Sequence, residues 1–179
     1  METKRYSKFI YDFGIDHYSG FQGVYFNKIL KNIMEIGKLR ERGSLKVLDF
    51  GCGLKKLKPY ITNYVGYDIN KRFTEVNEWQ KVDFDIVVAN AVFMYMTEKE
   101  LEMFIKKLYR HNPNAELIFG ATRMNFITKL IKFITLSIKG YADVKLTYDE
   151  QLQILSKYFT ILKKRTIFGL SNVYLMRFK

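Results

Sequence analysis

The sequence predicts an α/β fold with a mostly parallel sheet, helices on both faces and an antiparallel last strand. Three observations predict it. Apolar runs of strand length alternate with stretches whose apolar residues recur at helical spacing. Residues 84–89 (FDIVVA) are almost wholly apolar, as in a parallel strand that is covered on both faces. Residues 159–168 and 172–179 are β-rich and are joined by a short Gly-Leu-Ser link, which is typical of a closing antiparallel hairpin.

The first half of the chain predicts one long helix and two strands around a glycine turn. Ile29, Ile33 and Ile36 belong to a series of apolar residues spaced as in a helix that is buried on one face. The predicted elements, in order, are a helix over 21–42 that ends at Gly43, a strand over 46–50, a turn at Gly51 and Gly53, a short helix over 54–62 and a strand over 64–69.

The second half contains two capping-box signatures, in which a threonine is followed three residues later by a glutamate. They predict that helices begin at Thr97 and at Thr147. The other elements expected here are a strand over 115–120 after an Asn-Pro-Asn turn and a helix over 125–139.

The middle of the chain is short. Only 14 residues, 70–83, separate the second predicted strand from residues 84–89. This is tight for a helix followed by a further strand, so we expect one of the two to be reduced or lost.

Composition favours one globular domain over residues 1–179, with 1–43 as an N-terminal helical lid. The chain is 48% hydrophobic and has a single cysteine, which excludes disulfide scaffolds and Cys-rich metal sites. The N-terminus lacks the apolar core of a signal peptide, and no apolar run reaches the length of a membrane span. A cytoplasmic protein without a transmembrane segment is expected.

The net charge of +12 is compatible with RNA, an anionic membrane surface or an acidic substrate. However, no Lys/Arg-dense run or RNA-binding signature accompanies it. Solvated lysines are the simpler interpretation, so a nucleic-acid partner is an alternative that the sequence does not favour.

The glycine turn is the stretch that carries chemistry. A dinucleotide fingerprint needs a third glycine where Lys56 stands, and a P-loop needs a Gly-Lys-Ser/Thr run that is absent, so NAD and ATP are disfavoured. Asp49 precedes the glycines, and Asp68 closes the second strand, where a carboxylate can accept ribose hydroxyls. Two carboxylates favour a nucleoside cofactor that has a positive charge and no phosphate.

Three segments resemble class I S-adenosylmethionine-dependent methyltransferases: 47–53 (VLDFGCG), 66–68 (GYD) and 84–90 (FDIVVAN). The resemblance covers about residues 44–179. It implies a three-layer Rossmann-like methyltransferase fold, here with a shortened middle region. One departure is the missing third glycine near Leu54 and Lys55.

The resemblance also implies S-adenosylmethionine as cofactor and assigns the residues that bind it. Asp49 is expected near the amino group of the cofactor and Asp68 at its ribose. The full set of expected contacts is Asp49, Phe50, Gly51, Cys52, Gly53, Asp68, Ile69 and Asn90. The adenine is assigned less narrowly, to Asn77, Glu78 or Trp79, and Trp79 is equally compatible with plain core packing.

Catalysis would be an in-line methyl transfer, for which the protein mainly aligns the reactants. Asn90 is expected to face the methyl group. His17 or Tyr18 is a candidate for lining the acceptor site, although lid packing is the simpler role for both. His111 is expected on the surface at the opposite end of the sheet. No metal is expected.

Residues 125–139 combine a wide apolar face with lysines. Such a helix can cap an apolar acceptor or lie on a membrane surface, and it can equally be a helix packed on the sheet. The favoured function is methyl transfer to a small acceptor, apolar or lipid-linked. The alternatives are an RNA methyltransferase and a non-catalytic, methyltransferase-like binding subunit.

Overall fold

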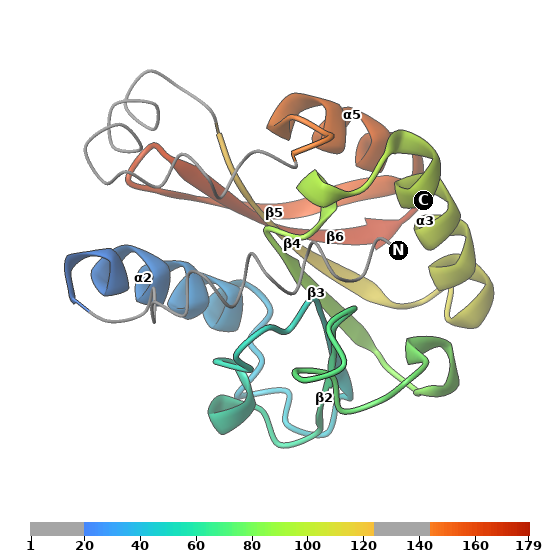
Figure 1. Cartoon of the computed structure of the whole chain (residues 1–179), viewed down its shortest axis with the longest axis horizontal. Coiled ribbons are helices and arrows are strands. Elements are labelled where there is room, and N and C mark those ends of the chain that lie inside the picture. Colours follow the sequence, from blue (N-terminus) through green and yellow to red (C-terminus); the bar gives the residue numbers. More distant parts are fainter. Residues whose placement is uncertain (1–19, 124–143) are drawn as a thin grey trace.

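The computed structural model describes residues 20–123 and 144–179. Within them a six-stranded sheet has the order β2-β1-β3-β4-β6-β5 (Figure 1). The strands are β1 (Val47–Phe50), β2 (Tyr64–Tyr67), β3 (Ile86–Asn90), β4 (Glu116–Thr122), β5 (Phe159–Ile167) and β6 (Ser171–Phe178). The α-helices are α2 (Gly20–Ile36), α3 (Glu98–His111) and α5 (Tyr148–Tyr158), and short 3-10 turns are η1 (Lys58–Tyr60), η2 (Trp79–Lys81) and η3 (Phe93–Tyr95).

The topology confirms the predicted fold class. Strands β2, β1, β3 and β4 are parallel, whereas β6 runs antiparallel to both of its neighbours, β4 and β5. The chain passes from β1 to β2 on one side and then crosses to β3 on the other side of β1. This reversal makes the carboxyl ends of β1 and β3 a topological switch point, which is where ligands bind in open α/β sheets.

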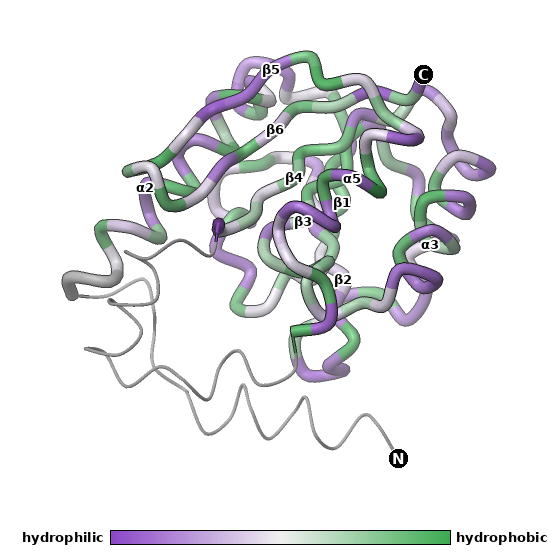
Figure 2. The backbone as a smooth tube through the Cα atoms, turned by 90° about the horizontal axis from the view of Figure 1, so that it is seen from above, coloured by the Kyte–Doolittle hydropathy of each residue, from purple (hydrophilic) through white to green (hydrophobic). Residues whose placement is uncertain are grey.

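Helices cover both faces of the sheet and give it three layers (Figure 1). Helix α2 packs Ile29 and Ile33 on one face, against residues such as Val88 and Ile118. Helices α3 and α5 pack on the other face. Figure 2 shows the central strands largely in the hydrophobic colour, whereas α3 alternates between the two colours, as expected of a helix with one buried side.

Both predicted capping boxes are present. The Thr97 hydroxyl accepts from the Glu100 N–H (3.3 Å), and the Glu100 carboxylate accepts from the Thr97 N–H (2.7 Å). Thr147 and Glu150 repeat the same pair of bonds at the start of α5. Each box satisfies N–H groups that the first helical turn leaves without an intrahelical partner.

The predicted end of the first helix is wrong. Helix α2 ends at Ile36 and not at Gly43, and it ends in a Schellman motif. Lys38 takes a left-handed conformation (φ 50°), and the N–H of Leu39 donates to the carbonyl of Met34 (2.9 Å). Leu39 is buried, so the apolar periodicity continues beyond the helix although the helical backbone does not.

The predicted shortening of the middle region is confirmed, and it is more extensive than predicted. The short helix expected over 54–62 is reduced to a turn and to η1. Between β2 and β3 the structure has neither an α-helix nor a strand, but only turns and η2. Strand β2 is therefore an edge strand of the sheet.

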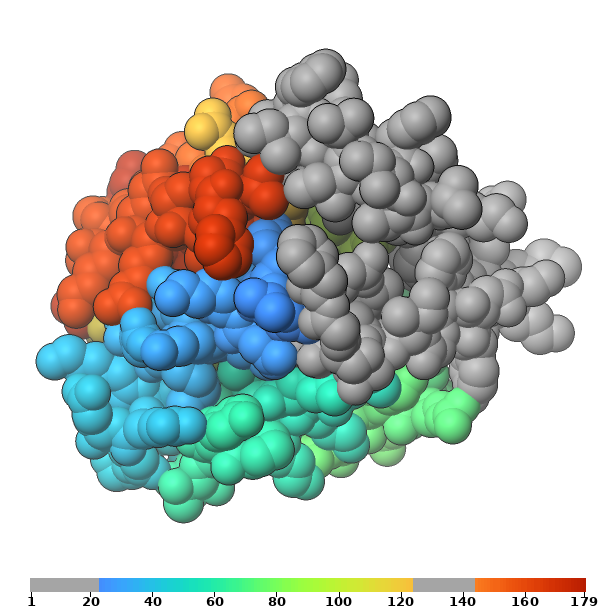
Figure 3. Space-filling model, turned by 90° about the vertical axis from the view of Figure 1, so that its left-hand side faces the viewer, coloured from blue at the N-terminus to red at the C-terminus, as the bar shows by residue number. Residues whose placement is uncertain are grey.

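The helix predicted over 125–139 lies outside the described residues, as do residues 1–19 of the predicted lid. No helix in the described parts of the chain is both long and apolar enough to cross a membrane. Figure 3 shows α2 (blue) between the β5–β6 hairpin (orange and red) and the segments that surround β2 (teal).

Candidate functional site

Polar side chains replace apolar ones where the parallel strands reach their carboxyl ends. On the face that packs against α2, Val47 of β1 is followed two residues later by Asp49, and Val88 of β3 by Asn90. Asp68 comes directly after β2. Because alternate residues of a strand share a face, these side chains form one polar row at the switch point.

The glycine turn after β1 needs glycine for two different reasons. Gly51 has φ +78°, and a Cβ there would lie 2.2 Å from Cγ2 of Val92. Gly53 has φ +46°, but nothing lies within 4 Å of the position of its Cβ. Gly51 is thus fixed by packing and by conformation, whereas Gly53 has a positive φ and open space beside it.

Asp68 ties the end of β2 to the glycine turn. It is 8% exposed, and its carboxylate accepts from the N–H groups of Gly53 (3.0 Å) and Asn70 (2.8 Å). An ionised carboxylate offers about four lone-pair sites. Two backbone bonds therefore leave Asp68 with capacity to accept hydroxyl groups.

Asp49 is a buried carboxylate in an anionic setting. It is 5% exposed and accepts a hydrogen bond from the Tyr64 hydroxyl (2.9 Å). Burial raises the pKa of Asp49 to about 7, with help from the charges of Asp68 and Glu75 and against the effect of the Tyr64 bond. A cation placed beside Asp49 would relieve both the desolvation and the repulsion.

Glu75 closes the edge of β2. Its N–H donates to the carbonyl of Gly66 (2.8 Å), and its carboxylate accepts from the N–H of Gly66 (2.9 Å). Lys58 and Lys55 pair with the same carboxylate at 2.6 and 3.7 Å. One residue thus satisfies both backbone groups of Gly66, which a further strand would otherwise bond, and it anchors two lysines that follow the glycine turn.

The charge of Glu75 is stabilised in place. Burial opposes its ionisation, but the hydrogen bonds from Lys58 and from the Gly66 N–H outweigh this and lower the pKa of Glu75 below its ordinary value. Lys55 itself takes a left-handed conformation, with φ +53°. It therefore adopts, close to the expected third glycine, a backbone conformation that glycine adopts without strain.

Two further predicted cofactor contacts, besides Asp49 and Asp68, have buried side chains. Phe50 points to the α3 face and stacks on Tyr67, with ring centroids 5.3 Å apart. Cys52 is buried with its Sγ 3.5 Å from the carbonyl of Phe73, and burial raises the pKa of its thiol to about 12. The thiol is therefore protonated at neutral pH, and the exposed part of this stretch is mainly backbone.

Ile69 and Asn90 lie on the solvent side of the site. Ile69 follows Asp68 and is 61% exposed, which is high for a large apolar side chain. Asn90 is half-buried at the end of β3, and its Oδ1 lies only 2.4 Å from where a Cβ of Gly120 would be. The absence of a side chain on β4 at Gly120 makes room for the Asn90 amide.

The three adenine candidates separate in the structure. Trp79 is 4% exposed and packs on Phe50 and Phe104, so it belongs to the core. Asn77 and Glu78 are exposed, and Glu78 pairs with Lys81 at 2.8 Å.

The histidine predictions fall in different parts of the chain. His17 lies outside the described residues, as does Tyr18, so their predicted places at the acceptor site stay predictions. His111 is exposed at the end of α3, with its Nε2 3.0 Å from the carbonyl of Val82, which confirms its expected place at the opposite end of the sheet. Among the described residues no group of His, Cys, Asp or Glu is arranged to hold a metal ion.

Three residues of the site were missed in the sequence: Tyr64, Glu75 and Val92. Tyr64 has a signal, because Tyr64, Gly66 and Asp68 alternate along β2 and so share the face of Asp49. Glu75 and Val92 have no such signal in the sequence, because both act through contacts between segments that are distant along the chain.

The chain resembles solved structures of known proteins, but its sequence matches none of the family models or curated proteins. A protein of Pyrococcus horikoshii OT3 superposes with a TM-score of 0.64 at 16% identity, over 93% of this chain and 98% of that one. Magnesium protoporphyrin IX methyltransferase from Synechocystis PCC 6803, solved with bound S-adenosylhomocysteine, gives 0.61 at 16% identity over 99% and 100%.

The N-methyltransferase NodS from Bradyrhizobium japonicum WM9 gives a TM-score of 0.57 at 14% identity, over 86% of this chain and 96% of that one. The three structures align with nearly their whole length. At these identities the likeness establishes the fold. The chain therefore has the Rossmann-like fold of class I S-adenosylmethionine-dependent methyltransferases, as its motifs predict.

Proposed function

We propose that this chain is an S-adenosylmethionine-dependent methyltransferase. The observation that carries the proposal is the pair of buried carboxylates, Asp49 and Asp68, on either side of a glycine turn at the switch point of the sheet. The fold and the methyltransferases that share it support the same conclusion.

The residues present fit this cofactor. Asp49 has the electrostatics of a site for a cation, because its pKa is raised by burial and by neighbouring carboxylates. The space beside Gly53 lets a ligand approach the backbone. Asp68 would accept the ribose hydroxyls with its remaining lone pairs, and exposed Ile69 offers an apolar surface for the flat adenine.

The bound cofactor would supply an electrophilic methyl group on a sulfonium. The protein's contribution is then orientation. Asp49 would hold the amino group, and the glycine turn, fixed by Asp68 and by Val92, would set the position of the methionine part. Asn90 would lie beside the methyl group, since it ends the strand next to β1 on the same face.

For the acceptor we infer a small molecule, apolar or lipid-linked. The apolar and lysine-rich composition of residues 125–139 supports this inference, because the segment comes after β4 in the sequence, and the carboxyl end of β4 lies at the same edge of the sheet as the site. Magnesium protoporphyrin IX, the substrate named for the Synechocystis enzyme, is also a small molecule.

Calorimetric titration with S-adenosylmethionine tests the proposal. We expect binding to the unmodified chain, a large loss of affinity in Asp68→Ala, and no change in Glu41→Ala, which removes an exposed carboxylate outside the polar row. If the folded, unmodified chain does not bind the cofactor, the proposal is wrong.

A further inference from the structure

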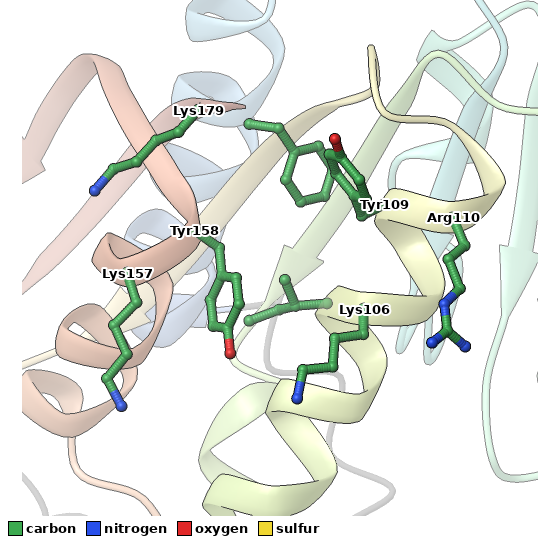
Figure 4. A pocket seen from close by; sticks show the side chains of 8 residues that line it. Lys106, Tyr109, Arg110, Lys157, Tyr158 and Lys179 are labelled. Carbon is green, nitrogen blue, oxygen red and sulfur yellow. The ribbon is translucent and has the colours of Figure 1, made fainter.

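A cleft lies at the end of the sheet opposite the glycine turn (Figure 4). It has a volume of about 330 Å³ and is formed by the last turns of α3 and α5 together with the end of β6. Its place is fixed by two contacts: His111 at the end of α3 reaches Val82 just before β3, and the N–H of Lys179 donates to the carbonyl of Tyr158 (3.0 Å).

The floor of this cleft is apolar and aromatic. Its apolar lining includes Ile105, which is almost fully buried, and the half-buried Phe178, whereas Tyr109 has 51% of its surface exposed. The ring of Tyr109 meets that of Phe178 edge to face with centroids 5.2 Å apart, and the ring of Phe159 stacks on that of Phe178 with centroids 4.2 Å apart. A flat ligand could therefore lie against aromatic surface that is already held in place.

The rim of the cleft is cationic. Lys106 and Arg110 are one turn apart on α3, Lys157 comes from α5, and none of the side chains that line the cleft is acidic. Figure 4 shows Tyr158 between Lys106 and Lys157, with its hydroxyl and both amino groups pointing the same way. Two ammonium groups and a phenol thus present donors in one direction, as an anion requires.

Part of this charge is already compensated. Lys157 pairs with Glu98 (3.4 Å) and Glu102 (3.7 Å), which lie on α3 beside the cleft. Arg110 and Lys157 also lie in the last turns of their helices, where cations interact favourably with the helix dipole. An anion at Lys157 would have to compete with Glu102, so removal of the Glu102 charge should strengthen anion binding.

We propose that this cleft binds a nucleotide unit, either free or within a single-stranded nucleic acid. The base would stack on the exposed ring of Tyr109, and the phosphate would bind Lys106, Lys157 and the Tyr158 hydroxyl. The cleft is within the size range of small-ligand sites. It is remote from the polar row at Asp49, so this inference does not depend on the proposed methyltransferase activity.

The chemistry of the lining distinguishes a nucleotide from other anions. A fatty acid would need a deep apolar enclosure for its chain, whereas this floor is a shallow aromatic surface open to solvent. A nucleotide combines a compact phosphate with a flat ring, and the cleft combines a compact group of donors with exposed aromatic surface.

The test uses the folded chain with uridine 5′-monophosphate and a fluorescently labelled oligouridylate, both in the presence of S-adenosylhomocysteine so that a cofactor site is not probed instead. We expect binding that Lys106→Glu weakens by about tenfold or more, because the variant replaces a phosphate-binding cation by an anion. The matched control is Lys107→Glu, an identical charge change at an exposed neighbour that does not line the cleft, and it should leave the affinity within about twofold.

Two further variants separate this site from a general attraction between charges. Glu102→Gln should tighten binding, since it frees Lys157 from a competing carboxylate. Tyr109→Ala should weaken binding without changing its dependence on salt concentration, because it removes stacking surface and no charge.

The two sources of the nucleotide differ in their salt response. Tighter binding of the oligonucleotide with a steep salt dependence indicates a nucleic-acid strand, and equal affinities with a shallow dependence indicate a free nucleotide. The proposal is overturned if neither probe binds, or if Lys107→Glu weakens binding as much as Lys106→Glu does. Circular dichroism of each variant establishes that it is folded.

Discussion

The sheet ends on one side in β2 and on the other in β5, and these two edge strands differ in length, cover and charge. β2 has four residues, and Glu75 bonds both outward-facing groups of its Gly66. β5 has nine residues, of which the seven between Phe159 and Ile167 are exposed. It carries a Lys-Lys-Arg run, the type of residue that keeps open edges from pairing with other chains.

Only at the β2 edge does the residue that protects the edge also contact residues beside the candidate cofactor site. At β2 the residue that closes the edge also holds Lys55 and Lys58, next to the glycine turn. At β5 the protection comes from charge and is remote from the site. Changes at the β2 edge should therefore affect stability and cofactor binding together, whereas changes at the β5 edge should affect neither binding nor the site.

The largest effect is expected from Gly51, in the turn after β1, whose N–H donates to the carbonyl of Tyr67 at the end of β2. Gly51→Ala should abolish cofactor binding and lower the free energy of unfolding by roughly 2–4 kcal/mol, because left-handed strain adds to the clash with Val92. The matched change at the other edge is Gly169→Ala, in the β5–β6 turn, where φ is +68° but nothing lies within 4 Å of the Cβ. It should cost about 1 kcal/mol and leave binding unchanged. Denaturant unfolding and calorimetric titration measure both, and equal effects of the two variants would contradict the comparison.

A smaller effect is expected from the residue that closes the edge. Glu75→Ala leaves the buried N–H of Gly66 without its acceptor, and should lower the free energy of unfolding by about 1–3 kcal/mol. It should also weaken S-adenosylmethionine binding, since Lys55 and Lys58 lose their anchor.

The control is Glu35→Ala, which removes the carboxylate that pairs with Arg165 of β5. Because this pair is exposed, neither the melting temperature nor the affinity should change measurably. If the Glu75→Ala variant is folded and binds the cofactor as tightly as the unmodified chain does, closure of the β2 edge does not contribute to cofactor binding.

The next effect depends on pH. With the pKa of Asp49 at about 7 in the free protein, its ionised form, which attracts a cation, is lost as the pH falls below 7. Affinity for S-adenosylmethionine should therefore fall between pH 7 and pH 5, and Asp49→Asn should bind weakly at every pH.

The stability of the free protein should respond in the opposite sense. The folded pKa of Asp49 is raised above its ordinary value of 3.8, so the folded state holds the proton more tightly and this contribution to stability is lost as the pH rises from about 4 through 7. Binding that stays constant from pH 5 to pH 8 would exclude this role for Asp49.

The smallest effect on the fold is expected at the β5 edge. Replacing Lys163 and Lys164 by valine should leave the melting temperature and cofactor binding nearly unchanged, but it should promote self-association, because it removes the charges that guard a long open strand. Light scattering over a range of protein concentrations measures this. Scattering equal to that of the unmodified chain would mean that charge does not protect this edge.

The sequence is informative where structure is local. The capping boxes at Thr97 and Thr147, the buried strand over 84–89 and the glycine turn all follow from short patterns, and all of these elements are present. The end of α2 did not follow, because the left-handed position is filled by Lys38 where glycine is the common choice.

The residues of the candidate site also divide into those that a local sequence pattern identifies and those that it does not. Asp49 and Asp68 are recognisable by their positions after strands, but Tyr64 and Glu75 act through contacts that only the folded chain makes. In the sequence, Lys56 argues against a dinucleotide-binding loop, and the lysines on either side of it have no assigned role. In the structure Lys55 and Lys58 are the partners of Glu75, and no rule based on the loop alone connects them to a carboxylate 17 to 20 residues away.

The closure of β2 by a single residue has a consequence for the minimum size of such a domain. In a parallel strand the N–H and C=O of one residue point to the same side and those of the next residue to the other side. A four-residue edge strand therefore presents only two outward pairs, those of Tyr64 and Gly66, and Glu75 bonds both groups of Gly66. A strand–helix unit can accordingly be absent from this edge when one carboxylate and one peptide N–H bond the central outward residue, so few groups are needed to close a short edge in a small domain with this fold.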